Sequence, residues 1–222
     1  MQITFLFLSS LLAGFLSLTH ALPAGAAPPY QVSAWTFGDN DSLGRACERN
    51  AIDEVSVDWY FSCVNGCIGV SGDEDPDFVA HAHARGLRVL ATVSNWNEAL
   101  GCFDPEIATA ILAGKASRDL HAARIVRLCK NKGYDGIDLD WESLRAADRN
   151  RFSAFVEELA KLLHQNNKIL AIAVHPKTSE PGGWSGPKAQ DWKRLGAAVD
   201  EFKIMTYDYS GSWGEPGPIA PP

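Results

Sequence analysis

Apolar and polar positions follow two alternating patterns along this chain of 222 residues. Helically spaced apolar positions predict helices at 42–50, 76–85, 105–132, 146–165 and 189–199, the third being a short helix and a longer one that ends at Gly133. Short apolar runs between them indicate strands at 31–37, 54–63, 88–94, 136–142, 169–175 and 202–209. Strands that alternate with helices predict an α/β fold with a parallel sheet covered by helices.

The first residues follow a different pattern. Positions 3–18 are almost wholly apolar, and small residues come directly after them. This arrangement predicts a secretory signal peptide over 1–21 and a flexible lead-in over 22–30, because the apolar run is short for a membrane span. We therefore expect a secreted, extracellular protein, with a lysosomal or cell-wall location as alternatives and no membrane association after cleavage. Residues 31–222 would form one domain.

Composition narrows the possible partners. Hydrophobic residues make up 46% of the chain, which suits one sizeable core, and the net charge of −7 argues against a nucleic-acid partner. Five cysteines in an exported chain should pair in part. Cys63 and Cys67 flank a turn-like segment and are placed to close a small loop, whereas Cys129 lies in an apolar helical stretch and is expected to be buried and free. A glycosylation sequon begins at Asn40.

The most informative segment is the predicted strand at 136–142, in which acidic and apolar residues alternate. Side chains on a strand point to opposite faces with a period of two, so Asp138, Asp140 and Glu142 should share one face. Like charges so close together cannot all ionise freely, and one proton should be shared. A solvated acidic edge strand is the alternative, but a helical segment rich in Leu, Phe and Val follows at once.

These residues resemble a known family. The pattern Asp135, Gly136, Asp138, Asp140, Glu142 is similar to the signature of family 18 glycoside hydrolases, the chitinases and their relatives, including chitobiases and peptidoglycan N-acetylglucosaminidases. A second segment, Met205-Thr206-Tyr207-Asp208-Tyr209, looks like the Met-x-Tyr-Asp motif of the same family. The resemblance implies a (β/α)8 TIM barrel, of which this sequence supplies about six of the eight βα units, so 31–222 would be a C-terminally incomplete catalytic domain.

The resemblance also implies substrate-assisted hydrolysis of β-1,4 bonds in N-acetylglucosamine polysaccharides such as chitin, without a cofactor. Glu142 would be the acid and then the base, Asp140 would hold the acetamido group of the sugar, and Asp138 would share a proton with Asp140. Tyr207 would align the acetamido oxygen. Asp208 would contact the same sugar, while Asp135 and Gly136 would be structural.

Aromatic side chains near strand ends are candidate platforms for sugar rings. The candidates are Trp35, Trp96, Tyr209 and Trp213, with Trp184 and Trp192 less favoured, whereas Trp141 should face the helices. His175 is placed either to line the cleft or to be structural. His81 and His83 would not share a helix face, so we expect no metal site.

Several alternatives remain open. The third predicted strand ends in Ser94-Asn95-Trp96-Asn97, where the family often has glycines, and this departure is shared with relatives that act on peptidoglycan. The polymer would therefore be chitin, chito-oligosaccharide or peptidoglycan. A non-catalytic chitin-binding lectin and an inactive fragment are the other readings. The oligomeric state and the choice between endo and exo action are not predicted.

Overall fold

The computed structural model describes residues 31–38, 43–44, 52–72, 74–211 and 214–220. The predicted signal peptide and lead-in, the Asn40 sequon, Cys47 and Trp213 lie outside these ranges, as does most of the helix predicted at 42–50. Residues 31–222 fall into one compact unit.

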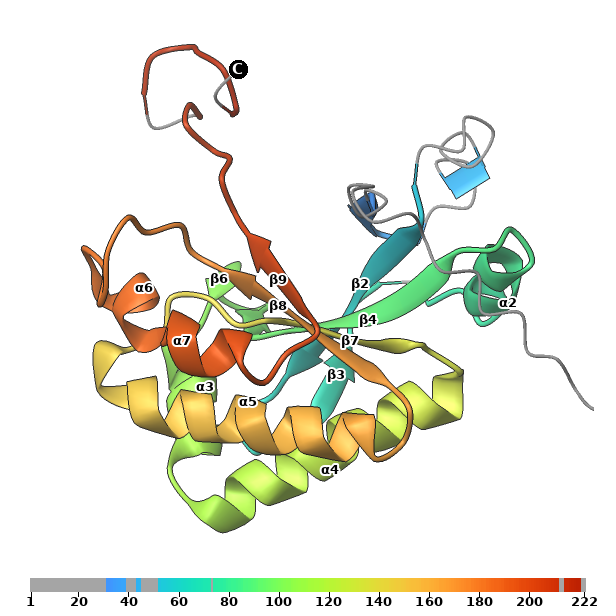
Figure 1. Cartoon of the computed structure of the whole chain (residues 1–222), viewed down its shortest axis with the longest axis horizontal. Coiled ribbons are helices and arrows are strands. Elements are labelled where there is room, and N and C mark those ends of the chain that lie inside the picture. Colours follow the sequence, from blue (N-terminus) through green and yellow to red (C-terminus); the bar gives the residue numbers. More distant parts are fainter. Residues whose placement is uncertain (1–30, 39–42, 45–51, 73, 212–213, 221–222) are drawn as a thin grey trace, which may run out of the picture. The chain divides into compact units, whose positions relative to one another are not determined.

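A curled parallel sheet forms the centre of this unit (Figure 1). Its strand order is β1-β2-β4-β7-β8-β9, and each neighbouring pair runs parallel. The strands are β1 (Ser33–Thr36), β2 (Glu54–Ser62), β4 (Arg88–Ser94), β7 (Gly136–Asp140), β8 (Ile169–Val174) and β9 (Glu201–Ile204). The predicted parallel sheet and its six strands are therefore confirmed, and the sheet forms part of a barrel.

Three short strands were not predicted. Strand β3 (Ile68–Val70) pairs antiparallel with β2, and β5 (Trp96–Asn97) forms a small hairpin with β6 (Cys102–Phe103). Runs of two or three residues are too short to show a period in the sequence.

Helices connect the strands. They are α2 (Phe78–His83), α3 (Pro105–Leu112), α4 (Lys115–Lys132), a 3₁₀ turn (Ala146–Asp148), α5 (Arg149–His164), α6 (Ser185–Ala189) and α7 (Trp192–Gly196). The division of 105–132 and the stop at Gly133, which adopts a left-handed φ of 79°, are confirmed. The single helix predicted at 189–199 is wrong, because Gln190 is extended and separates α6 from α7.

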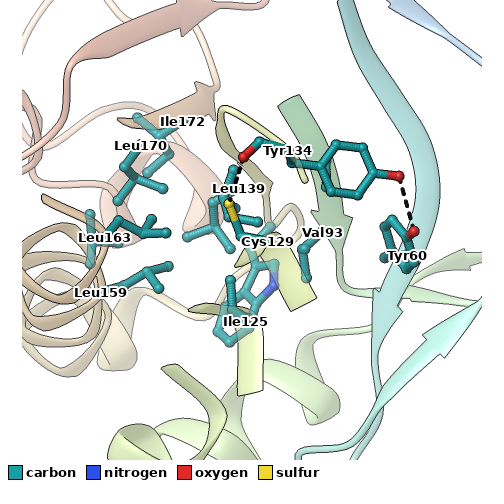
Figure 2. Packing of buried hydrophobic residues seen from close by; sticks show 14 of the residues in the cluster. Tyr60, Val93, Ile125, Cys129, Tyr134, Leu139, Leu159, Leu163, Leu170 and Ile172 are labelled. Carbon is teal, nitrogen blue, oxygen red and sulfur yellow. Dashed lines mark hydrogen bonds between the residues drawn. The ribbon is translucent and has the colours of Figure 1, made fainter. Parts of the chain in front are cut away.

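The core lies between the sheet and helices α4 and α5 (Figure 2). The apolar stripe of α5 is buried against the sheet, as its spacing predicted, and consists of Phe152, Phe155, Val156, Leu159 and Leu163. Trp141 is fully buried and stacks on Phe155 with ring centroids 5.0 Å apart, so its predicted place on the helix-facing side is confirmed. Cys129 is a buried free cysteine, also as predicted.

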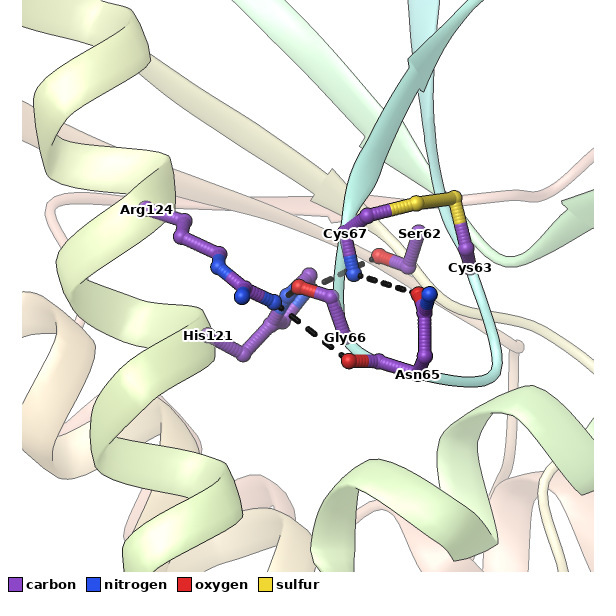
Figure 3. Close-up of a disulfide and its surroundings, with 7 residues drawn as sticks. All are labelled: Ser62, Cys63, Asn65, Gly66, Cys67, His121 and Arg124. Carbon is purple, nitrogen blue, oxygen red and sulfur yellow. Dashed lines mark hydrogen bonds between the residues drawn. A yellow bond between two sulfur atoms is a disulfide. The ribbon is translucent and has the colours of Figure 1, made fainter.

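A disulfide joins Cys63 to Cys67 and closes the turn between β2 and β3 (Figure 3). His121 of α4 supports this turn, because its Nδ1 lies 2.9 Å from the Gly66 carbonyl oxygen and its Nε2 lies 3.0 Å from Ser62 Oγ. Burial lowers the pKa of His121 to about 4, so the ring is neutral near pH 7 and acts as a structural link between helix and turn.

Neither a membrane-crossing helix nor a candidate metal cluster occurs in the described ranges of the chain. No helix there is long and apolar enough to cross a membrane, and no group of three His, Cys, Asp or Glu residues is placed to hold a metal ion. His83 instead pairs with Asp135 at 2.8 Å on the surface.

Candidate active site

The acidic residues of β7 lie on the inner face of the curled sheet, at the carboxyl ends of the strands. Asp138 is fully buried and Asp140 ends the strand. The prediction that the strand extends to Glu142 is wrong, because β7 stops at Asp140 and Ser143 adopts a left-handed φ of 52°. Glu142 therefore belongs to the loop that follows β7, which is where barrel enzymes carry catalytic groups.

Asn95 fixes the backbone of this loop. Its Oδ1 accepts a hydrogen bond from the Glu142 amide at 2.8 Å, and its Nδ2 donates to the Glu142 carbonyl oxygen at 2.9 Å. The same Nδ2 donates to the Asp104 carbonyl at 3.1 Å, and Asn95 is fully buried. In the sequence, this segment is distinguished only by its lack of glycines. The structure shows instead that Asn95 bonds both backbone groups of Glu142 and so sets where its carboxyl lies.

Replacing Asn95 with alanine should lower kcat by about 10-fold while KM changes less, because Glu142 would lose both of its backbone partners and its alignment with the substrate. Steady-state kinetics on a soluble oligosaccharide would measure this. Asn97→Ala is the matched control, since the Asn97 side chain bonds Asp104 and Ala99 and not Glu142. Equal losses in both variants would contradict the positioning role of Asn95.

The surroundings of Glu142 favour its protonated form. Burial, and then the negative charge of Asp208, raise the pKa of Glu142 to about 7. His175 lies beside it, with Nε2 at 3.8 Å from Glu142 Oε2. Burial lowers the pKa of His175 to about 4, so this ring is neutral near pH 7 and brings no charge to the carboxyl. Glu142 can therefore donate a proton near neutral pH.

Glu142 loses its proton as pH rises through about 7, so a reaction in which it acts as the acid should slow over this range. Stability should follow the same direction. The folded state holds this proton more tightly than the unfolded chain, so the contribution is fully present below about pH 4.5 and lost as pH rises through about 7, with a total of at most about 3 kcal/mol. Urea unfolding at several pH values, compared with Glu142→Gln, would measure it. Identical pH dependence in the two chains would contradict the assignment.

The two aspartates of β7 have different partners. Asp138 Oδ2 accepts a hydrogen bond from the Lys203 ammonium at 2.9 Å, across the inner face of the sheet. Asp140 has no such partner among the residues that the structure describes, and burial followed by the charges of Glu142, Asp138 and Asp58 raises its pKa well above the usual range. The cation that faces these acids is Lys203, which lies on β9 rather than on β7, so the alternation of residues within 136–142 gives no sign of it.

The second motif lies beyond its strand. The strand predicted at 202–209 is wrong in length, because β9 ends at Ile204 and Asp208 adopts a left-handed φ of 59°. Tyr207 lines the same cavity as Asp140 and Glu142. Burial and the nearby acids, first Asp140 and then Glu142, raise the pKa of Tyr207 to about 12, so its hydroxyl keeps its proton and can donate a hydrogen bond.

Two adjoining cavities open over these residues. The first has a volume of about 310 Å³ and brings together Asp140, Glu142, Tyr207 and Asp208 with the ring of Trp35. The second, of about 530 Å³, shares Asp140 with the first and is mostly aromatic, being lined by Phe37, Trp59, Phe61, Trp96 and Phe103. An aromatic cavity of this size, adjoining a second cavity that carries several acids, suits small ligands such as sugar rings.

The other predicted aromatic platforms that the structure describes do not line the two cavities. Tyr209 is exposed, its amide donates to the Ile219 carbonyl at 2.9 Å, and it does not line either cavity. Trp184 packs on His175 with ring centroids 4.6 Å apart, and Trp192 packs on Phe202. The structure therefore places Trp35 and Trp96 at the cavities and the other described candidates away from them.

Asp58 is a further carboxylate of the site, and the sequence pattern did not point to it. It lies on β2 where the pairing with β4 shifts by one residue, between Val57 and Tyr60, and it lines both cavities. Such bulges re-aim side chains and are frequent beside active sites. Burial, and then the charge of Asp138, raise the pKa of Asp58. The bulge is an irregularity in the pairing of β2 with β4, and no local sequence pattern predicts it.

The remaining two motif residues lie at the start of β7. Asp135 Oδ2 accepts a hydrogen bond from the Val89 amide at 2.8 Å and also pairs with His83. A Cβ on Gly136 would lie 2.5 Å from the Ile169 carbonyl oxygen, so only glycine allows β7 and β8 to approach this closely.

Known proteins share this architecture. The chitinase of Chromobacterium violaceum has a TM-score of 0.77 at 27% identity, over 86% of this chain and 60% of that one. A class V chitinase of Pseudomonas fluorescens has a TM-score of 0.76 at 35% identity, over 84% and 57%. The cortical fragment-lytic enzyme of Bacillus subtilis is 30% identical over 54% of this chain and 28% of that protein.

The chain spans about half the length, 54% and 39%, of the first curated relatives that it matches. The model of the glycosyl hydrolases family 18 matches residues 74–222, which include both motifs and every residue of β7. On this match, the chain belongs to glycosyl hydrolase family 18.

Proposed function

We propose that the protein hydrolyses β-1,4 bonds next to N-acetylglucosamine in chitin or chito-oligosaccharides, by substrate-assisted catalysis with retention of configuration. The observation that carries the proposal is the position of Glu142. Its carboxyl favours the protonated form near pH 7 and lines one cavity together with Asp140 and Tyr207. A proton donor, an acid that can hold an amide and a phenol donor are the groups that this reaction needs.

In this mechanism the acetamido oxygen of the sugar attacks the anomeric carbon, while Glu142 gives its proton to the leaving oxygen. Asp140 accepts a hydrogen bond from the acetamido N–H, and the Tyr207 hydroxyl donates to the acetamido oxygen. The C–O bond to the leaving sugar breaks as the oxazolinium ring closes. Glu142, now a carboxylate, then takes a proton from water, and the resulting hydroxyl opens the ring and restores the N-acetyl group.

The aromatic cavity beside Asp140 would hold further sugars of the chain. An aromatic ring packs against the C–H face of a pyranose without needing charge. Trp96 and Trp59 stand in the walls of this cavity, and Asp58 would accept hydrogen bonds from sugar hydroxyls. Asp208 would bind the sugar that carries the acetamido group, with Trp35 against its ring. The proposal needs no cofactor and no metal.

The proposed place of action is outside the cell, because the apolar start of the sequence has the features of a cleaved signal. Sequencing the N-terminus of the protein recovered from culture medium would test this. A mature chain that begins near residue 22 would support secretion, and retention of Met1 in the cell fraction would contradict it.

The central test is to incubate the 222-residue chain with soluble chito-oligosaccharides and follow the products by NMR. We expect new reducing ends that appear first as the β-anomer, because two displacements at the anomeric carbon retain its configuration. Initial α-anomer would contradict the substrate-assisted mechanism. Binding without any product would favour a lectin or an inactive fragment instead. The same assay on a longer chain that supplies two more βα units would separate those two outcomes.

Peptidoglycan is the second candidate polymer, and the similarity to a cortical fragment-lytic enzyme favours it. It carries the same N-acetylglucosamine units, so the chemistry at Glu142 would be unchanged. A comparison of kcat/KM on chito-oligosaccharides and on peptidoglycan fragments distinguishes the two, and a clear preference for the second would replace chitin as the substrate.

A further inference from the structure

Lys203 is a mostly buried cation on the inner face of the sheet. Its ammonium makes three hydrogen bonds, at 2.9 Å to Asp138 Oδ2, 2.9 Å to Ser56 Oγ and 3.1 Å to Glu54 Oε1. The Lys203 side chain is only 11% exposed. A buried ammonium needs such compensation, because it has left its water shell.

The strand between Lys203 and Asp138 makes this contact possible. In the register of the sheet, Asp138 of β7 lies beside Ala171 of β8, and Ala173 of β8 lies beside Lys203 of β9. Both alanines are buried and have small side chains. They leave room for the lysine stem to cross the inner face of β8 and reach an acid two strands away.

The charged side chains near Lys203 differ in whether they contact its ammonium directly. Glu54 of β2 is shared with Arg88 of β4, which also pairs with Glu201 of β9. From β1, the Trp35 ring lies 5.4 Å from Lys203 Nζ. The other ionisable groups of the cluster are Asp58 on β2, Asp140 on β7, and Glu142, Tyr207 and Asp208 in the loops. Of the two aspartates of β7, the Lys203 ammonium contacts Asp138 and not Asp140.

We propose that Lys203 is a positioning residue, which holds Asp138 as the charged carboxylate of the β7 pair and so leaves the proton on Asp140, next to Glu142. This inference rests on the proposed function, since it assigns a role within that reaction. With the proton on Asp140, one aspartate is neutral before substrate binds, and the two carboxyls are not both charged. Although burial opposes the charge on Lys203, the attraction and hydrogen bonds of Asp138 and Glu54 raise its pKa.

The first test measures the pKa of the Lys203 ammonium and does not depend on catalytic turnover. The titration of its ammonium is followed by NMR in two isosteric variants, Asp138→Asn and Asp140→Asn. We expect the pKa of Lys203 to fall by about one unit or more in Asp138→Asn, because a direct ionic partner is lost, and to change much less in Asp140→Asn. Equal shifts in the two variants would overturn the proposal. This result stands whether or not the chain hydrolyses sugar.

The second test uses kinetics. Lys203→Met should lower kcat by about 10- to 100-fold with a smaller change in KM, and the acid limb of kcat should move to higher pH, because the positive charge that opposes protonation of the acid cluster is removed. Lys203→Arg should restore most of kcat, since it keeps the charge. A Lys203→Met enzyme with an unmoved acid limb would contradict the assignment. If Lys203→Met does not fold, the Asp138→Asn titration, which retains Lys203, decides the question.

Discussion

Replacing Glu142 with glutamine should lower the hydrolysis of chito-oligosaccharides by about 10²- to 10⁴-fold, because glutamine cannot give a proton to the leaving oxygen. Glutamine keeps the shape of the side chain, and the backbone bonds to Asn95 do not involve it. We therefore expect substrate to bind nearly as tightly as before. Steady-state kinetics and isothermal titration calorimetry with the same oligosaccharide would measure the two effects separately.

The matched control for this change is Glu98→Gln. Glu98 is exposed, lies in the turn of the small hairpin, and lines neither of the two cavities that contain Asp140. Its replacement should leave both rate and affinity unchanged. Retained turnover in Glu142→Gln would remove Glu142 from the acid role and with it the proposed mechanism. Loss of binding together with turnover would mean that the carboxyl holds the ground state of the substrate as well.

Replacing Tyr207 with phenylalanine should lower kcat by about 10- to 1,000-fold, in the range found for the loss of one hydrogen-bond donor that stabilises developing charge. The hydroxyl is protonated at every pH at which the enzyme should work, since its pKa is raised to about 12. The loss should therefore be the same across the pH range. Kinetics at several pH values would measure this.

Tyr134→Phe makes the same chemical change away from the cavities. Its hydroxyl lies 3.0 Å from the Tyr60 hydroxyl in the core, so its loss should reduce the free energy of unfolding by about 1 kcal/mol and leave kcat unchanged. An unchanged rate in Tyr207→Phe would show that this ring only packs against Trp35.

The parts of the fold that sequence predicts well are those that depend on local patterns. The apolar stripe of α5 and the division between α3 and α4 are set within a few residues, by helical spacing and by Gly133. The ends of β7 and β9 were placed too late, because both motifs continue the alternation beyond the last paired residue. In each case a left-handed residue, Ser143 or Asp208, follows in the loop, and nothing in the sequence pattern marks it.

The residues of the candidate site likewise divide into those that a local pattern predicts and those that it does not. The two motifs lead to Glu142, Asp140 and Tyr207 because each motif is a continuous segment. Asn95, Lys203 and Asp58 were missed because their importance lies in contacts between segments. Asn95 meets Glu142 across 47 positions, and Lys203 meets Asp138 across 65. A single polar residue in an apolar run gives no sign of its partner until the strands are placed in order.

Polar contacts that join the first and last strands of the sheet affect how the chain folds during synthesis on the ribosome. Lys203 meets Glu54 across 149 positions, and Gln31 meets Glu201 across 170, at 3.2 Å. Glu54 is fully buried, and the ion pair with Lys203 that offsets part of its desolvation can form only after β9 has been synthesised. Contacts this distant in sequence slow folding. We expect the nascent chain to remain open, and accessible to chaperones and proteases, until residue 203 has left the exit tunnel.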